Sequence, residues 1–261
     1  MLEAVRLVQP ENDVSLKSDG EKISLVIGLG IGTTPAALAT HGIDTTVVEI
    51  DPEVVNLAKE HFHIPEKKLD IIVEDAEVFV NKALETNETK LYDYVVHDVF
   101  TGGVEPSALF TREFMQQLAQ LLKEDGVIAI NYAGDLKLPP AGLVVRTVLS
   151  VFPSCRIFRE GEASEAQDSD LTNLMIFCKR SPSPVQFREA TEEDYLGSVS
   201  RKSYLQPEFE IDAGFFAASN SGVEIVTEDN TEDLSMWHSQ SAANHWKIMR
   251  TVLPADVWES W

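Results

Sequence analysis

An apolar run that breaks into three alternating glycines constrains the fold of this chain most. Residues 25–33 read LVIGLGIGT, and a second apolar run ends at Glu49, about 20 residues beyond the first glycine, the spacing of a ribose-binding acid. A glycine turn between a buried strand and a helix lets a ligand approach the backbone, because no Cβ intervenes. A carboxylate that closes the next strand can accept hydrogen bonds from both ribose hydroxyls. Together they predict a site for an adenosine-containing cofactor.

The glycine spacing separates two classes of nucleotide site. A dinucleotide loop needs a third glycine where this chain has Thr33, and here the third glycine comes one residue earlier, at Gly32. This G-x-G-x-G spacing resembles the nucleoside loop of class I S-adenosylmethionine-dependent transferases, which bind no pyrophosphate. The alternative is a glycine turn that only packs a strand–helix–strand unit, which leaves Glu49 unexplained.

Composition limits the partners and the compartment. The formal net charge of −22 argues against nucleic acid, whose binding needs Lys and Arg, and leaves room for a cationic substrate; a solvated acidic surface is the simpler explanation. Residues 1–20 are polar and acidic, so we expect no secretory signal, and no apolar run is long enough for a membrane span. Cys155 and Cys178 read as small buried thiols of a reduced, cytoplasmic protein, with a disulfide between them as the alternative.

Short apolar runs alternate with helical patterns from Ile23 to Arg180, which predicts an α/β fold with a mostly parallel sheet. Continuous runs such as Ile71–Val73 are typical of strands buried on both faces. We predict a Rossmann-like, doubly wound sheet of seven strands. The predicted strands are residues 23–27, 45–50, 69–73, 92–98, 126–131, 155–160 and 173–179, and the helices between them begin near Thr34, Pro52, Ala76, Thr111 and Pro140.

Two prolines at 182 and 184 mark a boundary. We therefore predict three parts: an N-terminal lead (1–22), a Rossmann-like S-adenosylmethionine-binding domain (23–180) and a helical C-terminal extension (181–261). The extension is expected to hold helices from Thr191 to about Leu205 and from Leu234 to Val252. Its end carries all four tryptophans, a pattern more typical of a core or a homodimer surface than of a substrate cage. The tryptophans are Trp237, Trp246, Trp258 and Trp261.

In open α/β sheets the ligand lies beyond the carboxyl ends of the strands, so residues that end strands are the site candidates. Asp75 is placed to accept from an adenine amino group or to cap the helix that starts there, and both roles can hold together. Asp98 follows the fourth strand, where the transferred group would lie. His97 points to the opposite face if the strand continues, which favours core packing over catalysis. Asn131 and Tyr132 follow the fifth strand and are expected to line an acceptor pocket.

Six segments resemble the spermidine synthase family. They are GLGIG at 28–32, VEID at 48–51, EDA at 74–76, YDYVVHD at 92–98, LF at 109–110 and LKEDGV at 122–127. The resemblance implies a class I methyltransferase-like fold and transfer of an aminopropyl group from decarboxylated S-adenosylmethionine to make polyamines. Related branches are methyltransferases, and the glycine loop looks closer to those. HDVFTGG at 97–103 and NYAG at 131–134 are similar to fungal spermidine synthase-like proteins.

The resemblance implies roles for three acids, and the chain departs from the family's pattern at two positions. Glu49 matches the ribose acid, Asp75 the adenine contact and Asp98 the acid that deprotonates the attacking amine. Ile31 stands where the family has the aspartate that grips the aminopropyl amine, and Thr101 replaces a second acid for the polyamine. Each lost charge-assisted contact is worth roughly 1.5–3 kcal/mol, so the aminopropyl donor should bind poorly.

The sequence thus predicts a methyltransferase that uses S-adenosylmethionine and an amine or hydroxyl acceptor on a small molecule or a protein. Asp98 is the expected catalytic residue, and no metal site is expected. The predicted cofactor-binding residues are Gly28, Leu29, Gly30, Gly32, Glu49, Ile50, Asp75, Ala76 and Asp98, and the predicted substrate pocket comprises Phe100, Thr101, Asn131 and Tyr132. The alternatives are an aminopropyltransferase that uses decarboxylated S-adenosylmethionine, and a catalytically idle domain that binds cofactor or a partner.

Overall fold

The structure of the chain is a computed structural model. It describes residues 1–10, 18–86, 89–100, 104–162, 169–217, 223–252 and 254–259. Among these residues, no helix is long and apolar enough to cross a membrane.

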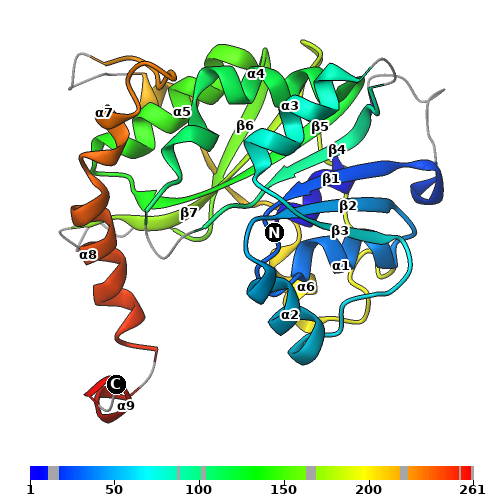
Figure 1. The fold of residues 1–261 in the computed structure, drawn as a ribbon, viewed down its shortest axis with the longest axis horizontal. Coiled ribbons are helices and arrows are strands. Elements are labelled where there is room, and N and C mark those ends of the chain that lie inside the picture. The colour runs from blue at the N-terminus through cyan, green and yellow to red at the C-terminus, as the bar shows by residue number, and fades with distance from the viewer. Residues whose placement is uncertain are drawn as a thin grey trace.

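An eight-stranded sheet forms the centre of the molecule, in the order β3-β2-β1-β4-β5-β7-β6-β8 (Figure 1). The strands are β1 (Ile23–Ile27), β2 (Asp44–Glu49), β3 (Leu69–Val73), β4 (Tyr92–His97), β5 (Leu122–Asp135), β6 (Ser154–Arg159), β7 (Leu171–Lys179) and β8 (Phe209–Ile211). β1 to β5 pair in parallel, whereas β7 is antiparallel to β5 and β6, and β8 is antiparallel to β6. The chain order reverses between β1 and β4, which is where such folds bind ligands.

Helices cover both faces of the sheet. The α-helices are α1 (Thr33–Thr40), α2 (Pro52–His61), α3 (Ala76–Glu85), α4 (Arg112–Leu121), α5 (Pro139–Val151), α6 (Val199–Tyr204), α7 (Glu232–Ser235), α8 (His238–Met249) and α9 (Ala255–Glu259); the 3₁₀ helices are η1 (Leu2–Leu7), η3 (Asp19–Glu21), η4 (Ser107–Phe110) and η5 (Ala213–Phe216). One hydrophobic core lies between the sheet and α3, α4 and α5, and a second lies between the sheet and η1, α1 and α2 (Figure 1).

Side-chain caps fix where several helices begin. The Asp51 carboxylate accepts from the Glu53 amide at 2.8 Å, with Pro52 in the first turn of α2, and Thr111 Oγ1 accepts from the Phe114 amide at 3.2 Å in α4. These local signals explain why the predicted starts of α2 and α3 are confirmed to the residue and the others within one position.

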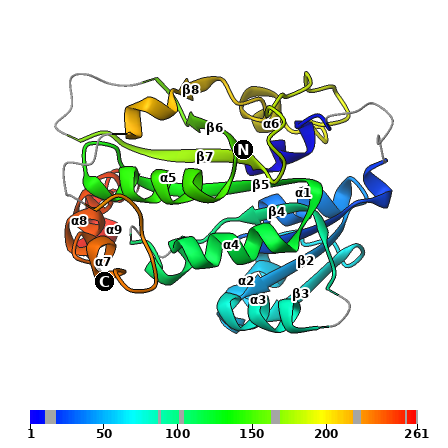
Figure 2. The same cartoon turned by 90° about the horizontal axis from the view of Figure 1, so that it is seen from above.

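The C-terminal part differs from the predicted helical extension. The predicted helix from Thr191 is wrong: Asp194 does accept from the Thr191 amide and hydroxyl, but Leu196 and Gly197 adopt positive φ, so helix α6 begins only after them. The predicted helix from Leu234 to Val252 is split into α7 and α8. β8 then adds the eighth strand to a sheet for which we expected seven. In Figure 2, α7, α8 and α9 overlap near one end of α5, and Figure 1 shows that they follow one another away from it, with α9 farthest.

Residues 2–8 are buried, although the lead as a whole has a polar composition. Every residue of η1 is buried, and Leu2, Val5 and Leu7 enter the second core. Arg6 pairs with Asp194 at 3.2 Å, side chain to side chain. The lead therefore packs against the segment that follows the proline boundary.

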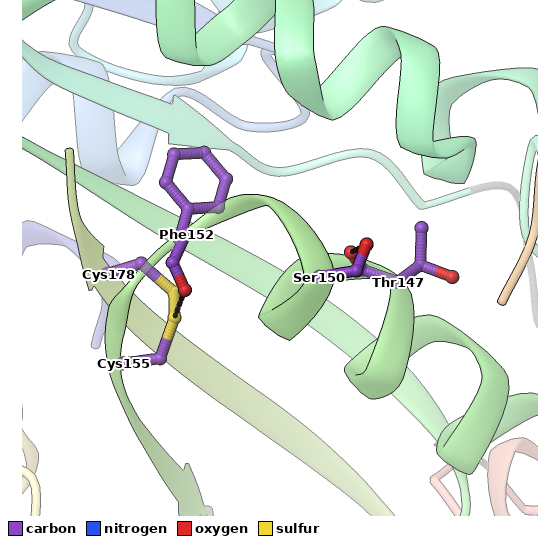
Figure 3. The surroundings of a disulfide bond; sticks show 5 residues. All are labelled: Thr147, Ser150, Phe152, Cys155 and Cys178. Carbon is purple, nitrogen blue, oxygen red and sulfur yellow. Dashed lines mark hydrogen bonds between the residues drawn. A yellow bond between two sulfur atoms is a disulfide. The ribbon is translucent and has the colours of Figure 1, made fainter. Parts of the chain in front are cut away.

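Cys155 and Cys178 form a disulfide, so the prediction of two free thiols is wrong (Figure 3). The two residues are direct partners in the antiparallel pairing of β6 and β7, with Cα atoms 4.1 Å apart. This proximity depends on the register between the strands, which neither segment reveals alone. The bond ties together two strands that follow one another in the chain.

Candidate functional site

The glycine loop after β1 lies directly against the end of β4. Gly28, Gly30 and Gly32 have φ values of 91°, 53° and 81°, in the left-handed region that favours glycine. A Cβ on Gly28 would lie 2.1 Å from the carbonyl oxygen of Asp98. Gly28 is therefore required by the close approach of two strand ends at the switch point.

A cavity of about 500 Å³ opens at this point, a size suited to a cofactor. All nine predicted cofactor-binding residues line it: Gly28, Leu29, Gly30, Gly32, Glu49, Ile50, Asp75, Ala76 and Asp98. Its walls come from the ends of β1, β2 and β4 and from the starts of α1 and α3. The structure thus brings together residues that the sequence spreads from Gly28 to Asp98, a convergence typical of ligand sites in this architecture.

Glu49 is the anchored acid of this cavity, which we call the cofactor cavity. Its side chain is held by two backbone amides: Oε2 accepts from Leu29 at 2.9 Å and Oε1 accepts from Asp51 at 3.0 Å. The residue is 8% exposed and still lines the cavity. Each carboxylate oxygen has a further lone pair, so the fixed carboxylate can accept from the two hydroxyls of a ribose.

Asp75 acts as a helix cap. Its Oδ1 accepts from the Glu77 amide at 2.8 Å and from the Val78 amide at 3.4 Å, at the start of α3. It also lines the cofactor cavity beside Ala76. The cap is observed, and the adenine contact stays a prediction that the same position allows.

Asp98 lies where the cofactor cavity meets a second cavity of about 330 Å³. Its Oδ1 accepts from the side-chain amide of Asn131 at 2.9 Å. Burial raises the pKa of the Asp98 carboxyl, and the Asn131 hydrogen bond opposes that rise.

The second cavity shares three residues with the first: Thr33, Thr34 and Asp98. Asn131 also lines it, and its role in an acceptor pocket stays a prediction. The two threonines start α1 directly after the glycine loop, and their place on a shared wall was not predicted. The only signal for them in the sequence is their position after Gly32.

The prediction that Tyr132 lines the substrate pocket is wrong, because this side chain lines neither of the two cavities. It is 2% exposed in the core beneath α4 and α5, where its hydroxyl donates to Glu105 Oε1 at 2.7 Å. β5 continues to Asp135, well past its predicted end. Successive strand residues face opposite sides, so Asn131 faces the second cavity and Tyr132 turns away from it.

Of the other two predicted pocket residues, Phe100 does not line the second cavity, and neither does the nearby His97. Phe100 lines the cofactor cavity, is half exposed, and its ring lies 5.1 Å from that of His245 in α8. Thr101 lies outside the described residues. His97 is fully buried, its Nε2 is 3.0 Å from the Leu109 carbonyl oxygen, and burial lowers its pKa to about 4. Within the described part of the chain, no group of His, Cys, Asp and Glu side chains is arranged to hold a metal ion.

Comparison with known proteins identifies the family. Residues 13–138 match the family model of the spermine/spermidine synthase domain. The whole chain is 50% identical over 271 aligned residues to a protein of Emericella nidulans named N-terminal histidine N-methyltransferase, and it covers 48% of that protein. The chain thus spans about half the length of this relative.

Two solved structures share the fold at 20% sequence identity. A probable spermidine synthase from Corynebacterium glutamicum has a TM-score of 0.61, with 83% of this chain and 75% of that chain covered. Human Methyltransferase-like protein 13 in complex with SAH has a TM-score of 0.53, with 85% and 94% covered. Together with the strand order and the glycine-loop cavity, these matches show that the chain belongs to the spermidine synthase-like proteins of the class I methyltransferase fold.

Proposed function

We propose that this chain transfers a methyl group from S-adenosylmethionine to a nitrogen atom of an acceptor. The observation that carries the proposal is the arrangement of the two cavities, which meet at the half-buried carboxylate of Asp98. Rate enhancement in such a transfer comes mainly from holding the donor carbon and the nucleophile in line at about 3 Å. Two cavities joined at one carboxylate are suited to that task.

The cofactor cavity offers a hydrogen-bond acceptor for the ribose and for the adenine of the nucleoside. Glu49 would hold the ribose hydroxyls, Asp75 with Ala76 would face the adenine, and the glycine loop would run beneath the sugar. When bound, S-adenosylmethionine supplies a sulfonium methyl group: a nitrogen–carbon bond forms, the carbon–sulfur bond breaks, and its electron pair remains on sulfur.

Asp98 would prepare the attacking nitrogen. An amine attacks only when it is unprotonated, and Asp98 Oδ2, which accepts no hydrogen bond from the described residues, would accept its proton. On an imidazole, a carboxylate that accepts from one ring N–H leaves the lone pair on the other ring nitrogen free to attack. Asn131 fixes Oδ1, so it orients the carboxylate for either role.

For the acceptor, we propose a peptide that begins with histidine. The 50% identical relative is named an N-terminal histidine N-methyltransferase, and every residue of this chain lies within the alignment. Incubation with S-adenosylmethionine and such a peptide, followed by mass spectrometry, tests the proposal. Failure to add 14 mass units to the peptide, with the cofactor bound, would refute this acceptor.

Aminopropyl transfer is the competing function, and the spermine/spermidine synthase domain favours it. Ile31 argues against it, because this apolar side chain lines the cofactor cavity where the synthases carry an aspartate for the donor amine. Thermal-shift measurements with S-adenosylmethionine and with its decarboxylated form separate the two. A ligand at about 100 times its Kd adds roughly 2.7 kcal/mol to the free energy of unfolding, so only the true donor should raise Tm strongly.

For the compartment, we propose an oxidising environment in place of the cytoplasm. The cytoplasmic expectation rested on free thiols at Cys155 and Cys178, and the disulfide removes that support. Alkylation of the protein from its native source, followed by non-reducing mass spectrometry, would find these cysteines protected; alkylated thiols would restore the cytoplasmic assignment.

The homodimer expectation remains a proposal as well. Trp246 is 48% exposed and its ring packs on Trp258 at 5.0 Å, at the far end of α8. Light scattering on the purified chain tests it, and a mass of one chain would remove it.

A further inference from the structure

We infer that the second cavity receives the acceptor, and that Glu160 and Glu208 hold a cationic amino group at the end remote from Asp98. This inference rests on the proposed methyl transfer, because it takes Asp98 as the end at which the nitrogen reacts. It adds the place, the orientation and the recognising side chains of the acceptor.

The floor of this cavity, which we call the acceptor cavity, is one face of β5 and β7. Asn131 pairs directly with Met175 in the antiparallel register, and Asn173 lies two residues from Met175 on the same face. The other walls come from residues 1–3 of the N-terminal lead and from Tyr204 to Phe209. These segments are far apart in sequence, and only the packing of the lead against residues beyond 180 closes the cavity.

The strand order gives the cavity two distinct ends. Asp98 follows β4, and Glu160 follows β6, with β5 and β7 between them. Neighbouring strands lie about 4.8 Å apart, so the two backbone positions are separated by roughly 14 Å before the side chains reach inward. An acceptor that touches both carboxylates must carry one nitrogen at each end.

The charges lining the cavity leave a net negative potential. Arg159 is neutralised by a two-pronged contact with Asp170 at 2.6 and 3.0 Å, and Glu3 is paired with Arg201 at 2.9 Å. Among the described residues, Asp98 accepts from the neutral amide of Asn131 at 2.9 Å and Glu160 from that of Asn173 at 2.8 Å. The last lining acid is Glu208, and no side chain within the described ranges forms a salt bridge with it or with Glu160. The Met1 ammonium also lines the cavity and is attracted by Glu160, so it offsets one of the three remaining carboxylates and leaves the net charge negative.

The two carboxylate–amide pairs give this potential a defined geometry. Asn131 and Asn173 each fix one carboxylate over the same sheet face, one at each end of the cavity. Met175 lies between them, and Tyr204 and Phe209 contribute apolar surface opposite. The arrangement suits a molecule with an apolar or aromatic middle, a nucleophilic nitrogen at one end and a protonated amine at the other.

Glu160→Gln tests the assignment, with Glu162→Gln as the matched control, since Glu162 lies two residues further on and does not line the cavity. The substrates are a peptide that begins with histidine and the same peptide with an acetylated amine. A charge-assisted contact to a cation is worth enough to raise KM about 10-fold or more when it is lost. We expect that rise for Glu160→Gln with the free peptide, a further rise when Glu208→Gln is added, and little change in kcat.

The affinity for S-adenosylhomocysteine should be the same in all variants, because the mutated side chains do not line the cofactor cavity. Acetylation of the peptide should raise the KM of the wild-type protein and leave the KM of Glu160→Gln nearly unchanged. Equal KM values for Glu160→Gln and Glu162→Gln would overturn the inference, as would a wild type that uses both peptides equally well.

Failure of the proposed function gives a different result. If the wild type binds S-adenosylhomocysteine but methylates neither peptide, methyl transfer to histidine is refuted. Calorimetry with the free peptide and with spermidine then tests cation binding in the acceptor cavity independently of methyl transfer. Binding of either cation that is weakened by Glu160→Gln and not by Glu162→Gln supports the inference. Absence of binding, or binding that the substitution leaves unchanged, overturns it.

Discussion

Replacing Asp98 by asparagine should remove catalysis and spare the fold. Asparagine keeps an oxygen that can accept from Asn131, so the 2.9 Å hydrogen bond can persist while the negative charge and the proton acceptor disappear. Loss of a positioned general base lowers the rate by about 100-fold or more. A 100-fold loss corresponds to about 2.7 kcal/mol of transition-state stabilisation.

The stability change has the opposite sign. Burial raises the pKa of Asp98 above its unfolded value, so the folded state holds the proton more tightly than the unfolded chain does. The ionised carboxylate therefore destabilises the fold at neutral pH, and this cost disappears only as pH falls below the unfolded value of about 3.9. We expect Asp98→Asn to leave Tm unchanged or to raise it at pH 7, and to lose that advantage in acid.

The assay is single-turnover transfer to a histidine peptide, with the affinity for S-adenosylhomocysteine measured by calorimetry. The acid limb of the wild-type pH profile should lie above the ordinary aspartate range. Asn131→Ala removes the contact that lowers the pKa of Asp98, so it should move this limb to higher pH. A variant Asp98→Asn that transfers at the wild-type rate would refute the reasoning, and so would one that loses the cofactor.

Three further outcomes can be measured on the same protein. Glu49→Ala should abolish detectable binding of S-adenosylhomocysteine in calorimetry and also lower Tm, because two backbone amides lose their acceptor at about 1–3 kcal/mol each; retained affinity contradicts the ribose role. Tyr132→Phe should lower the free energy of unfolding in urea by about 1–3 kcal/mol, since Glu105 loses its donor, while kcat/KM stays within a factor of about two; a large kinetic loss would return Tyr132 to the site. The double change Cys155→Ala and Cys178→Ala should cost about 3 kcal/mol in the same measurement, from the 23-residue separation of the linked positions; equal stability would mean that the bond constrains little.

The sequence alone determined the cofactor half of the site. The three glycines, Glu49 and Asp98 are each recognised from a short segment, because positive φ and the end of a buried strand have local signatures. The parallel pairing of the first five strands follows from the alternation of apolar runs with helical patterns, since that alternation is typical of strand–helix–strand units. The relation of the chain to the spermidine synthase-like proteins also came from these segments.

The tertiary structure decided the features that depend on which segments meet. The disulfide depends on the register between β6 and β7. Asn131 lines a cavity and Tyr132 is buried in the core because β5 continues past Asn131 to Asp135, so the two side chains face opposite sides of the sheet. The acceptor cavity combines the first residues of the chain with strands near 131 and 173 and with a segment near 208. No local pattern encodes such a cavity, because its shape is set by how a lead with a polar composition buries its apolar side against a distant segment, and that burial is a property of the whole packed core.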